Sequence, residues 1–433
     1  MNAGSVSASP QDTPILLSAR WVFPVAGELI VDGGVVLQGA HIAGIGPSDQ
    51  LTAQFPSAVV QDLGNRLILP GLVNAHTHLE LSFLHGQTPY NGNFVDWVRE
   101  VARRRTAFAG DYDKLIRQAC TDSLSAGVTT IGDISVGNRA WRALREQPIR
   151  KTCFAEVFGI TAEIQAVQDY LTEQAKHLQG DELMKLGISP HAPYSVGQPL
   201  YEAVAVLAQR HGLPVTTHLA ETHIEETFLR TGQGPWQDYL KELDKWDGSF
   251  HRPGCGPVEY LLRMNLSGRR FLLAHVNYLT DSELSSLAKS SHYVVFCPRA
   301  HRFFGHENHR FREMLAGGIP VCLGTDSLGS NDSLSILDEM RFLYREYPGL
   351  DPADLIRIGT INGAMALGWK SQTGTLEIGK AGDLIAVSLP ENADSPCETL
   401  LRTDAVPDVV YVHGRQVVPG EQDSDSPSPR AVP

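Results

Sequence analysis

Residues 67–78 read LILPGLVNAHTH, a continuous apolar run that ends in two histidines one residue apart. Comparable apolar runs follow along the chain, separated by longer stretches of helical pattern. They are VTTIGDIS (128–135), KTCFAEVFG (151–159), MKLGISPH (184–191), LPVTTHLAE (213–221), RFLLAHVNY (270–278), HYVVFCPR (292–299) and IPVCLGTD (319–326). Strands buried on both faces and joined by crossover helices form a parallel sheet, and eight in succession favour a closed (β/α)8 barrel of the TIM type. The fold class is therefore α/β. No GxGxxG follows the first run, which speaks against a dinucleotide-binding fold.

The segments before and after these runs have a different sequence pattern. Residues 14–68 and 374–419 alternate short apolar runs with Gly and Asp turns, a pattern typical of short antiparallel strands. Neither segment has enough apolar residues for its own core, so we expect both to form one small β-sandwich domain beside a barrel of residues 69–373. Residues 1–13 and 420–433 are polar and rich in Ser, Pro or Asp, and we expect them to be disordered.

Composition excludes several classes of function. The chain has 433 residues, 42% of them hydrophobic, and a formal net charge of -13. No block of basic residues suits a nucleic acid, and no apolar run approaches the length of a membrane span. The start of the chain lacks the basic and apolar regions of a signal peptide, and the six cysteines show no CxxC spacing. We therefore expect a soluble cytoplasmic protein that acts on a small molecule, not on a nucleic acid or a membrane.

Polar residues end several of the predicted strands, where barrel enzymes place their chemistry. The first run ends in His76 and His78, the fifth in His218, the sixth in His275 and the eighth in Asp326. Three imidazoles and a carboxylate suit Zn²⁺, or alternatively Fe²⁺, with a position left open for water. His275 is either a further ligand or a base that polarises the bound hydroxide. We favour the second role, because His76, His78, His218 and Asp326 already suffice as ligands.

The fourth run ends in His191 and not in a lysine, while Lys185 falls at the opposite end of that run. Binuclear sites in barrels of this kind resemble one another in using a carboxylated lysine there as a bridge. The sequence therefore predicts one divalent metal per chain. His191 becomes a candidate substrate contact, with a structural hydrogen bond to the neighbouring loop as the alternative.

Glu221 lies three residues after His218 in the segment HLAE. A carboxyl group at that position is close enough to share the water of the metal without binding the ion. It can take a proton from that water and pass it to a ring nitrogen, which is the general acid/base step that hydrolytic deamination needs.

Two further segments carry weaker signals. The three histidines of CPRAHRFFGHENHRF (297–311) lack the HExxH spacing of a metal site, so we expect a loop that lines the substrate. Trp97, Arg99 and Glu100 lie in the amphipathic stretch FVDWVREVARRR. They either close over a substrate or form a solvated helix face.

These motifs, taken together, resemble the amidohydrolase superfamily, specifically its mononuclear deaminase and chlorohydrolase branch. The matching segments are PGLVNAHTHLELS (70–82), SPHAPYS (189–195), HLAET (218–222), LLAHVNY (272–278), CPRAHRFFGH (297–306), LGTDSLGSNDSLSILDEMRF (323–342) and GTLEIGKAGDLIAV (374–387). The resemblance implies that His76, His78, His218 and Asp326 bind the metal, that Glu221, His275 and Asp326 act in catalysis, and that His191 contacts the substrate.

Within that branch, Glu80 in HTHLELS and the CPRxxxFFGH segment are most similar to the 6-aminodeoxyfutalosine deaminases of the alternative menaquinone route, and similar also to methylthioadenosine/S-adenosylhomocysteine deaminases. The loop has Ala300 where that resemblance would lead us to expect serine. The resemblance implies a hydrolase that removes the exocyclic amine of a 6-aminopurine nucleoside by attack of metal-bound hydroxide, and a homodimer. We expect Glu80 from this motif, and Trp97 and Arg99 from the amphipathic stretch, to be further substrate contacts. Adenosine, guanine or a chlorinated triazine are alternative substrates, and a metal-free scaffold is the alternative from a different class.

Overall fold

The computed structural model describes residues 13–160, 164–177, 180–246, 248 and 250–417. Its centre is a parallel eight-stranded sheet in the order β13-β12-β11-β10-β9-β8-β7-β6, so each strand pairs with its neighbours in the chain. These strands are β6 Leu72–Thr77, β7 Val128–Val136, β8 Arg150–Val157, β9 Met184–Pro190, β10 Val215–Leu219, β11 Phe271–His275, β12 Tyr293–Phe296 and β13 Val321–Leu323. Each of the eight predicted runs contributes one strand to this sheet, in the predicted order, which confirms the barrel fold.

The barrel closes where its first and last strands meet. Thr77 and Asp326 form an isolated parallel bridge. The backbone N–H groups of Thr325 and Asp326 both donate to the carbonyl oxygen of His76, at 3.1 Å each. The closure of the barrel therefore also holds together two of the chain segments that carry predicted site residues.

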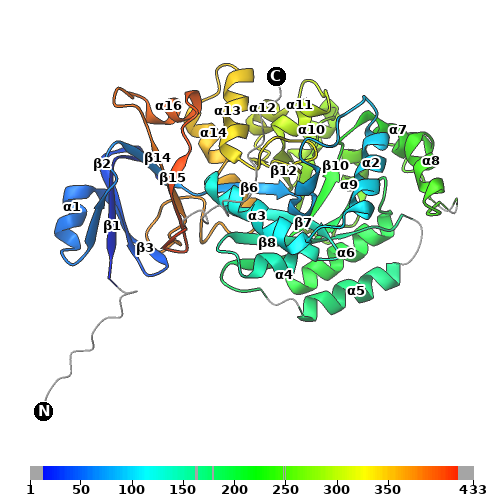
Figure 1. Ribbon diagram of the computed structural model, residues 1–433. Helices are drawn as coiled ribbons and strands as arrows, with labels where there is room; N and C mark the ends of the chain where they lie inside the picture. Colours follow the sequence, from blue (N-terminus) through cyan, green and yellow to red (C-terminus); the bar gives the residue numbers. More distant parts are fainter. Residues whose placement is uncertain (1–12, 161–163, 178–179, 247, 249, 418–433) are drawn as a thin grey trace, which may run out of the picture.

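Helices follow the barrel strands and cover the outside of the sheet (Figure 1). After β6 come η1 Leu79–Leu84, α2 Phe94–Ala107 and α3 Tyr112–Ser125; after β7, α4 Arg139–Arg145; after β8, α5 Ile164–His177; and after β9, α6 Gln198–His211. The region after β10 contains α7 His223–Thr231, α8 Pro235–Glu242 and α9 Pro257–Arg263, and β11 is followed by α10 Asp281–Leu287. The last strands are followed by α11 Pro298–Phe303, α12 Phe311–Ala316, α13 Ile336–Glu346, α14 Pro352–Ile358 and α15 Ile361–Ala366.

Side-chain caps mark where several of these helices begin. Asn93 accepts hydrogen bonds from the backbone of Val95 and Asp96 at the start of α2. Thr280 and Glu283 form a reciprocal capping box at the start of α10. Because these caps satisfy N–H groups that have no partner inside the helix, they fix where the chain turns from a loop into the helix.

A second sheet combines strands from both ends of the chain, as expected. Its order is β16-β15-β14-β5-β1-β2-β3, with β4 paired to β1. The strands are β1 Ile15–Val22, β2 Ile30–Gln38, β3 His41–Pro47, β4 Val59–Asp62, β5 Arg66–Pro70, β14 Leu384–Ser388, β15 Pro407–Val412 and β16 Arg415–Gln416, accompanied by α1 Ser48–Gln54 and α16 Pro396–Arg402. Figure 1 shows the blue amino-terminal strands beside the orange and red carboxyl-terminal ones.

The first predicted strand needs a correction, because residues 67–76 are not one strand. The chain divides at Gly71: β5 belongs to the second sheet, and β6 begins the barrel. A Cβ at Gly71 would lie 2.0 Å from the side-chain oxygen of Thr129 on β7. Glycine is therefore required where the chain passes from one sheet to the other, because the side chain of Thr129 occupies the space that a Cβ would need.

A buried ion pair joins the two sheets. The guanidinium of Arg150 on β8 lies 2.7 Å from the carboxylate of Asp383, and both side chains are fully buried. Asp383 also accepts a hydrogen bond from the backbone of His413, at 2.7 Å. Because buried charges are tolerated only when they are paired, this contact fixes how the second sheet sits against the barrel.

The predictions of disorder for residues 1–13 and 420–433 fall almost entirely outside the described residues. Within the part of the chain that the structure describes, no helix is both long and apolar enough to cross a membrane.

Candidate active site

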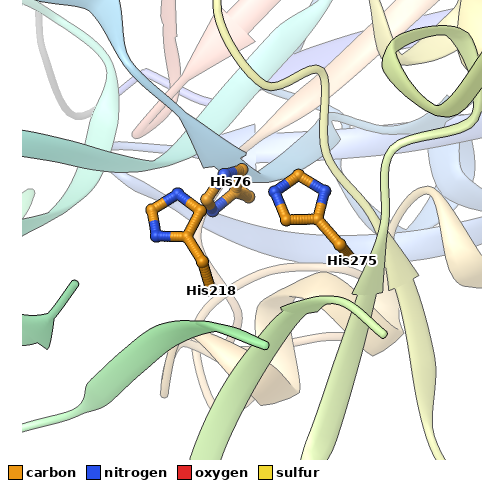
Figure 2. Close-up of side chains that lie close together, drawn as sticks. All are labelled: His76, His218 and His275. Carbon is orange, nitrogen blue, oxygen red and sulfur yellow. The ribbon is translucent and has the colours of Figure 1, made fainter. Parts of the chain in front are cut away.

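Histidines from three strands converge at the carboxyl ends of the barrel strands. His76 on β6, His218 on β10 and His275 on β11 lie close together and turn toward a common centre (Figure 2). The fourth histidine is His78, whose Nε2 lies 3.3 Å from Nε2 of His218. Two nitrogens of His76, Nδ1 and Nε2, are buried without a hydrogen-bond partner among the described residues. Unpaired buried nitrogens on several converging imidazoles indicate a ligand that the side chains share.

Asp326 supplies a carboxylate to the same centre. Its Oδ1 lies 3.8 Å from Nε2 of His76 and 3.8 Å from Nε2 of His78. Its other oxygen, Oδ2, accepts a 2.7 Å hydrogen bond from the hydroxyl of Ser330. One carboxylate oxygen is therefore held by the protein, while the other faces the histidines.

The backbone at the ends of these strands is strained. His275 and Asp326 have positive φ angles of 74° and 58°, and Ala220, next to Glu221, has a φ of 51°. Residues other than glycine rarely adopt this conformation, and such strain is concentrated at functional sites. At these positions it directs side chains from the strand ends toward the centre of the barrel.

Burial keeps the imidazoles neutral. Loss of solvent lowers the pKa of His76 well below its ordinary value, and the neighbouring His218 lowers it further. Burial likewise lowers the pKa of His275. Neutral imidazole is the form that binds a metal, because protonation removes the lone pair that the ion needs.

This set of side chains fits a divalent metal. Ligand atoms of His76, His78 and Asp326 all lie within 4.8 Å of one another, and so do those of His76, His218 and His275. Nitrogen and carboxylate donors in such a cluster suit a transition metal or zinc and are unlike the oxygen-only sites of Ca²⁺ and Mg²⁺. The predicted ligands are thus brought together, and His275 also lies close enough for either of the two roles expected of it.

Glu221 lies beside this centre with its backbone held in place. One of its carboxylate oxygens is 3.6 Å from Nε2 of His275. Its N–H donates to the carboxylate of Glu225, at 2.9 Å, and its carbonyl accepts from Asn277, at 3.0 Å. Burial and the negative charge of Asp326 raise the pKa of Glu221 well above its ordinary value. The carboxyl group is therefore well placed to exchange protons with a reactant beside the metal centre.

A cavity of about 690 Å³ opens above these residues. His78, His218, His275, Glu221 and Asp326 form part of its wall. Aromatic side chains form another part: Phe94, Trp97, Phe158, Tyr194, Trp236, Tyr239 and Trp246. A largely apolar cavity of this size with a few convergent polar groups is typical of a small-molecule site.

Three of the four predicted substrate contacts line this cavity, and one does not. Glu80, Trp97 and His191 belong to its wall, whereas Arg99 is not among the lining residues. Arg99 instead forms a two-pronged ion pair with Glu242 on α8, at 3.0 Å for each contact. A substrate contact of Arg99 stays a prediction.

Glu80 lies on the cavity wall but is already engaged by the protein. Its carboxylate forms ion pairs with Arg105 and Arg139. It also accepts a hydrogen bond from the backbone of Val136, at 3.3 Å. Glu80 therefore holds the two arginines in place, whether or not it also touches a substrate.

None of the three histidines of residues 297–311 is among the residues that line the cavity, contrary to the expectation of a substrate loop. Nε2 of His309 lies 2.9 Å from the carbonyl oxygen of His275 and supports the strained end of β11. His306 contacts the hydroxyl of Tyr278, at 2.7 Å.

The sequence reasoning missed two further residues. Glu156 lines the cavity and lies within a predicted strand, where two further apolar residues follow it, so the search for polar residues directly after an apolar run passed over it. Ser330 lies in the segment that resembles the amidohydrolases, but no pattern indicated that its hydroxyl would bond to Asp326.

A (β/α)8 barrel with histidines and an aspartate at its strand ends, beside a buried carboxyl group, defines a metal-dependent hydrolase site. The Amidohydrolase family model matches residues 67–417, so the chain belongs to this family of hydrolases and acts on carbon–nitrogen bonds.

Two curated relatives and one solved structure are similar to the chain. An aminodeoxyfutalosine deaminase of Deinococcus radiodurans is 31% identical over 82% of this chain and 86% of its own length. A 5-methylthioadenosine/S-adenosylhomocysteine deaminase of Saccharophagus degradans is 26% identical over 89% of this chain and 86% of its own length. The crystal structure of Helicobacter pylori aminofutalosine deaminase shares the fold, with a TM-score of 0.83, 24% identity, and coverage of 93% of this chain and 100% of that one.

Proposed function

We propose that the protein is a metal-dependent aminohydrolase that replaces the exocyclic amine of a 6-aminopurine nucleoside with oxygen and releases ammonia. The observation that carries this proposal is the position of Glu221, 3.6 Å from His275 and beside the histidine and aspartate cluster, in the wall of a cavity large enough for a nucleoside. The similarity to the Deinococcus radiodurans enzyme makes 6-aminodeoxyfutalosine the first candidate substrate.

His76, His78, His218 and Asp326 are the proposed ligands of one divalent metal, and Zn²⁺ suits this donor set best. When bound, such an ion supplies Lewis-acid activation of a water molecule. Asp326 combines this role with a contact to the attacking water, because one of its oxygens faces the cavity side of the cluster.

Glu221 and His275 handle the protons in this proposal. Glu221 takes a proton from the attacking water and delivers it to the ring nitrogen beside the reacting carbon. His275 orients the same water through Nε2, which is buried and has no hydrogen-bond partner among the described residues. The second proton of the attacking water then passes to the amine, the carbon–oxygen double bond forms as the carbon–nitrogen bond breaks, and the amine leaves as ammonia. Positioned proton transfer of this kind contributes typically about 10²- to 10⁴-fold to the rate.

The aromatic part of the cavity wall suits the flat ring of the substrate. Tyr194 and Trp236 stack on each other with ring centroids 3.8 Å apart. Trp97 is held by a hydrogen bond of 3.1 Å from its indole N–H to the carbonyl of Thr88. Rigid aromatic groups of this kind hold a planar ligand without losing much conformational freedom on binding.

The proposal is tested by measuring ammonia release from 6-aminodeoxyfutalosine, methylthioadenosine, S-adenosylhomocysteine, adenosine and guanine, using protein loaded with Zn²⁺. We expect the highest kcat/KM with 6-aminodeoxyfutalosine. The similarity to the Saccharophagus degradans enzyme makes methylthioadenosine or S-adenosylhomocysteine the second candidate. Metal-loaded protein that releases no ammonia from any of these compounds would refute the proposal.

A further inference from the structure

Glu156 is a buried acid that the proposed reaction does not use. It lies at the end of β8 (Arg150–Val157), it lines the cavity, and only 7% of its surface is exposed. Its Oε1 atom has no hydrogen-bond partner among the described residues. A buried polar atom without a partner destabilises a fold, so its presence in a binding cavity indicates that a ligand supplies the partner.

His191 lies beside this carboxyl group. Its Nε2 is 4.0 Å from Oε1 of Glu156, which is too long for a hydrogen bond. The other ring nitrogen, Nδ1, contacts the hydroxyl of Ser195 at 2.6 Å, and this contact fixes the orientation of the ring. Glu156 and the oriented ring of His191 therefore lie close together without satisfying one another.

Charged groups surround the pair. Burial raises the pKa of Glu156 to about 8; the positive charge of Arg105 opposes this shift, and the negative charges of Glu80 and Asp133 add to it. Arg105 is itself held by Glu80. The ion pair of Arg105 with Glu80 therefore lies on one side of the Glu156–His191 pair. On another side, the ring of Phe158 packs against His191 with centroids 4.8 Å apart.

The pair lies next to the catalytic centre without belonging to it. The rings of His191 and His218 pack with centroids 4.9 Å apart. Ligand atoms of Glu156, His191 and His218 lie within 4.8 Å of one another, which raises the alternative of a second metal ion. His218 cannot serve that ion independently, because its Nδ1 contacts the carbonyl of His191 at 2.9 Å and its Nε2 faces His78. Glu156 and His191 alone are too few ligands for a tightly held ion.

The chemistry of a 6-aminopurine nucleoside indicates which of its groups the pair binds. Its unsubstituted ring nitrogens are acceptors, and its amine lies at the reacting carbon beside Glu221. Apart from the amine, the hydrogen-bond donors of the nucleoside are the hydroxyls of its sugar. A hydroxyl both donates and accepts, so it satisfies a carboxyl group in either protonation state and an imidazole in either tautomer.

We infer that Glu156, together with His191, binds the adjacent hydroxyls of the substrate's ribose and makes the enzyme selective for ribonucleosides. This inference rests on the proposed nucleoside deaminase function. Glu156 is in this view a specificity-determining residue, and the proton transfer at the ring remains with Glu221.

The test combines variants of the enzyme with substrates that lack one hydroxyl of the ribose. Wild type, Glu156→Gln and the control Glu283→Gln are assayed for kcat and KM with adenosine and 5′-methylthioadenosine, and with the 2′-deoxy and 3′-deoxy forms of each. Glu283 suits as a control because it is buried in the capping box of α10 and does not line this cavity.

We expect Glu156→Gln to lower kcat/KM for the ribonucleosides by roughly 10- to 100-fold, the size expected when a buried hydrogen-bonding group loses its partner, mainly through KM. The deoxynucleosides that lack the bonded hydroxyl should change by less than about threefold between wild type and variant. Glu283→Gln should match wild type on every substrate. An equal loss on ribonucleosides and deoxynucleosides would overturn the inference, since a merely structural role of Glu156 predicts that result.

Two further measurements keep the inference testable if Glu156→Gln does not fold. In the wild-type enzyme, kcat/KM for a ribonucleoside must exceed that for one of its deoxy forms by a similar factor. A ratio of these two kcat/KM values near one overturns the inference while leaving the proposed function intact. A second zinc ion in wild type that Glu156→Gln or Glu156→Ala loses would also overturn it. Wild type that deaminates no nucleoside at all overturns the proposed function itself, and the inference with it.

Discussion

The hydroxyl of Ser330 donates a 2.7 Å hydrogen bond to Oδ2 of Asp326, so that Oδ1 is the oxygen 3.8 Å from Nε2 of both His76 and His78. Both residues are buried, and Asp326 adopts a left-handed backbone conformation with a φ of 58°. The serine therefore orients a proposed metal ligand that is also under backbone strain. Groups that hydrogen-bond to a ligand in this way typically affect metal affinity by about 10- to 100-fold.

Ser330→Ala should weaken zinc binding by at least about 10-fold, because Asp326 loses the contact that orients it. Competition with a chelator of known affinity measures this change. The matched control is Ser123→Ala, since Ser123 is a buried serine whose hydroxyl bonds to a carbonyl within α3. Equal zinc affinity in the wild type and Ser330→Ala would show that the backbone alone sets the position of Asp326.

Glu221→Gln and Asp326→Asn should differ in metal content. Glutamine keeps the shape of Glu221 but cannot exchange a proton, so the rate should fall by at least about 10²-fold while the metal content stays near that of wild type. Asparagine at 326 is a poorer ligand and removes a charge, so both metal content and rate should fall. Elemental analysis and ammonia release measure the two effects. Equal metal loss in both variants would make Glu221 a ligand and require a different mechanism.

The purified protein should hold one tightly bound divalent ion per chain. The residue that follows β9 is His191 and not a lysine. Lys185, near the start of β9, donates a hydrogen bond to the carbonyl of Gly368 and does not line the cavity. Elemental analysis after gel filtration gives the metal-to-chain ratio. Two tightly held ions would refute the mononuclear prediction, and much less than one ion per chain would favour a metal-free scaffold.

Asp383→Asn should destabilise the fold by roughly 3–5 kcal/mol, because it leaves the fully buried guanidinium of Arg150 without its charged partner. Urea denaturation followed by circular dichroism measures the change. Asp408→Asn is the matched control, since it removes a partly exposed ion pair with Arg66 and should cost no more than about 1 kcal/mol. Similar losses in the two variants would mean that burial does not set the strength of the Arg150 pair.

Glu339 on α13 should make stability depend on pH. Burial raises its pKa to about 8, although Asn331 and the backbone of Arg299 both donate hydrogen bonds to it. From about pH 4.5, near the ordinary pKa of a glutamate, up to about pH 8, the folded chain holds a proton that the unfolded chain has released. Stability from this group is thus fully present at low pH and is lost as the pH rises to about 8.

In Glu339→Gln, the decrease in unfolding free energy between pH 5 and pH 8 should therefore be smaller than in wild type by up to a few kcal/mol. The variant should also be less stable than wild type at pH 5, because one hydrogen-bond donor loses its acceptor. Urea titrations at several pH values measure this slope. A slope equal to that of wild type would contradict the prediction.

The succession of strands could be read from the sequence because each barrel strand is a continuous apolar run, and this pattern is local. The same locality explains the error at residues 67–76, which form two strands in two sheets. An apolar run does not reveal which sheet each part of it joins, because that depends on pairing with distant strands: β5 pairs with β14, and β6 pairs with β7.

The proposed ligands could be predicted for a related reason. Parallel strands present their carboxyl ends at the same edge of a sheet, so His76, His218 and Asp326 were expected to meet once their strands were recognised. Ser330 and Arg99 could not be assigned in this way, because the partner of a polar side chain outside the strands depends on how its loop or helix packs. The contact of Arg99 with Glu242 joins residues far apart in the chain.

By itself, the sequence determined the order of the barrel strands and the residues at their ends, because hydrophobic runs and the polar residues that follow them are properties of neighbouring positions. Only the tertiary structure decided which oxygen of Asp326 faces the histidines and that Arg150 pairs with Asp383. It also decided that Oε1 of Glu156 lies near His191 with no hydrogen-bond partner in the described part of the chain. These relationships join distant segments at distances of a few ångströms, and packing fixes them after the chain has closed into the barrel.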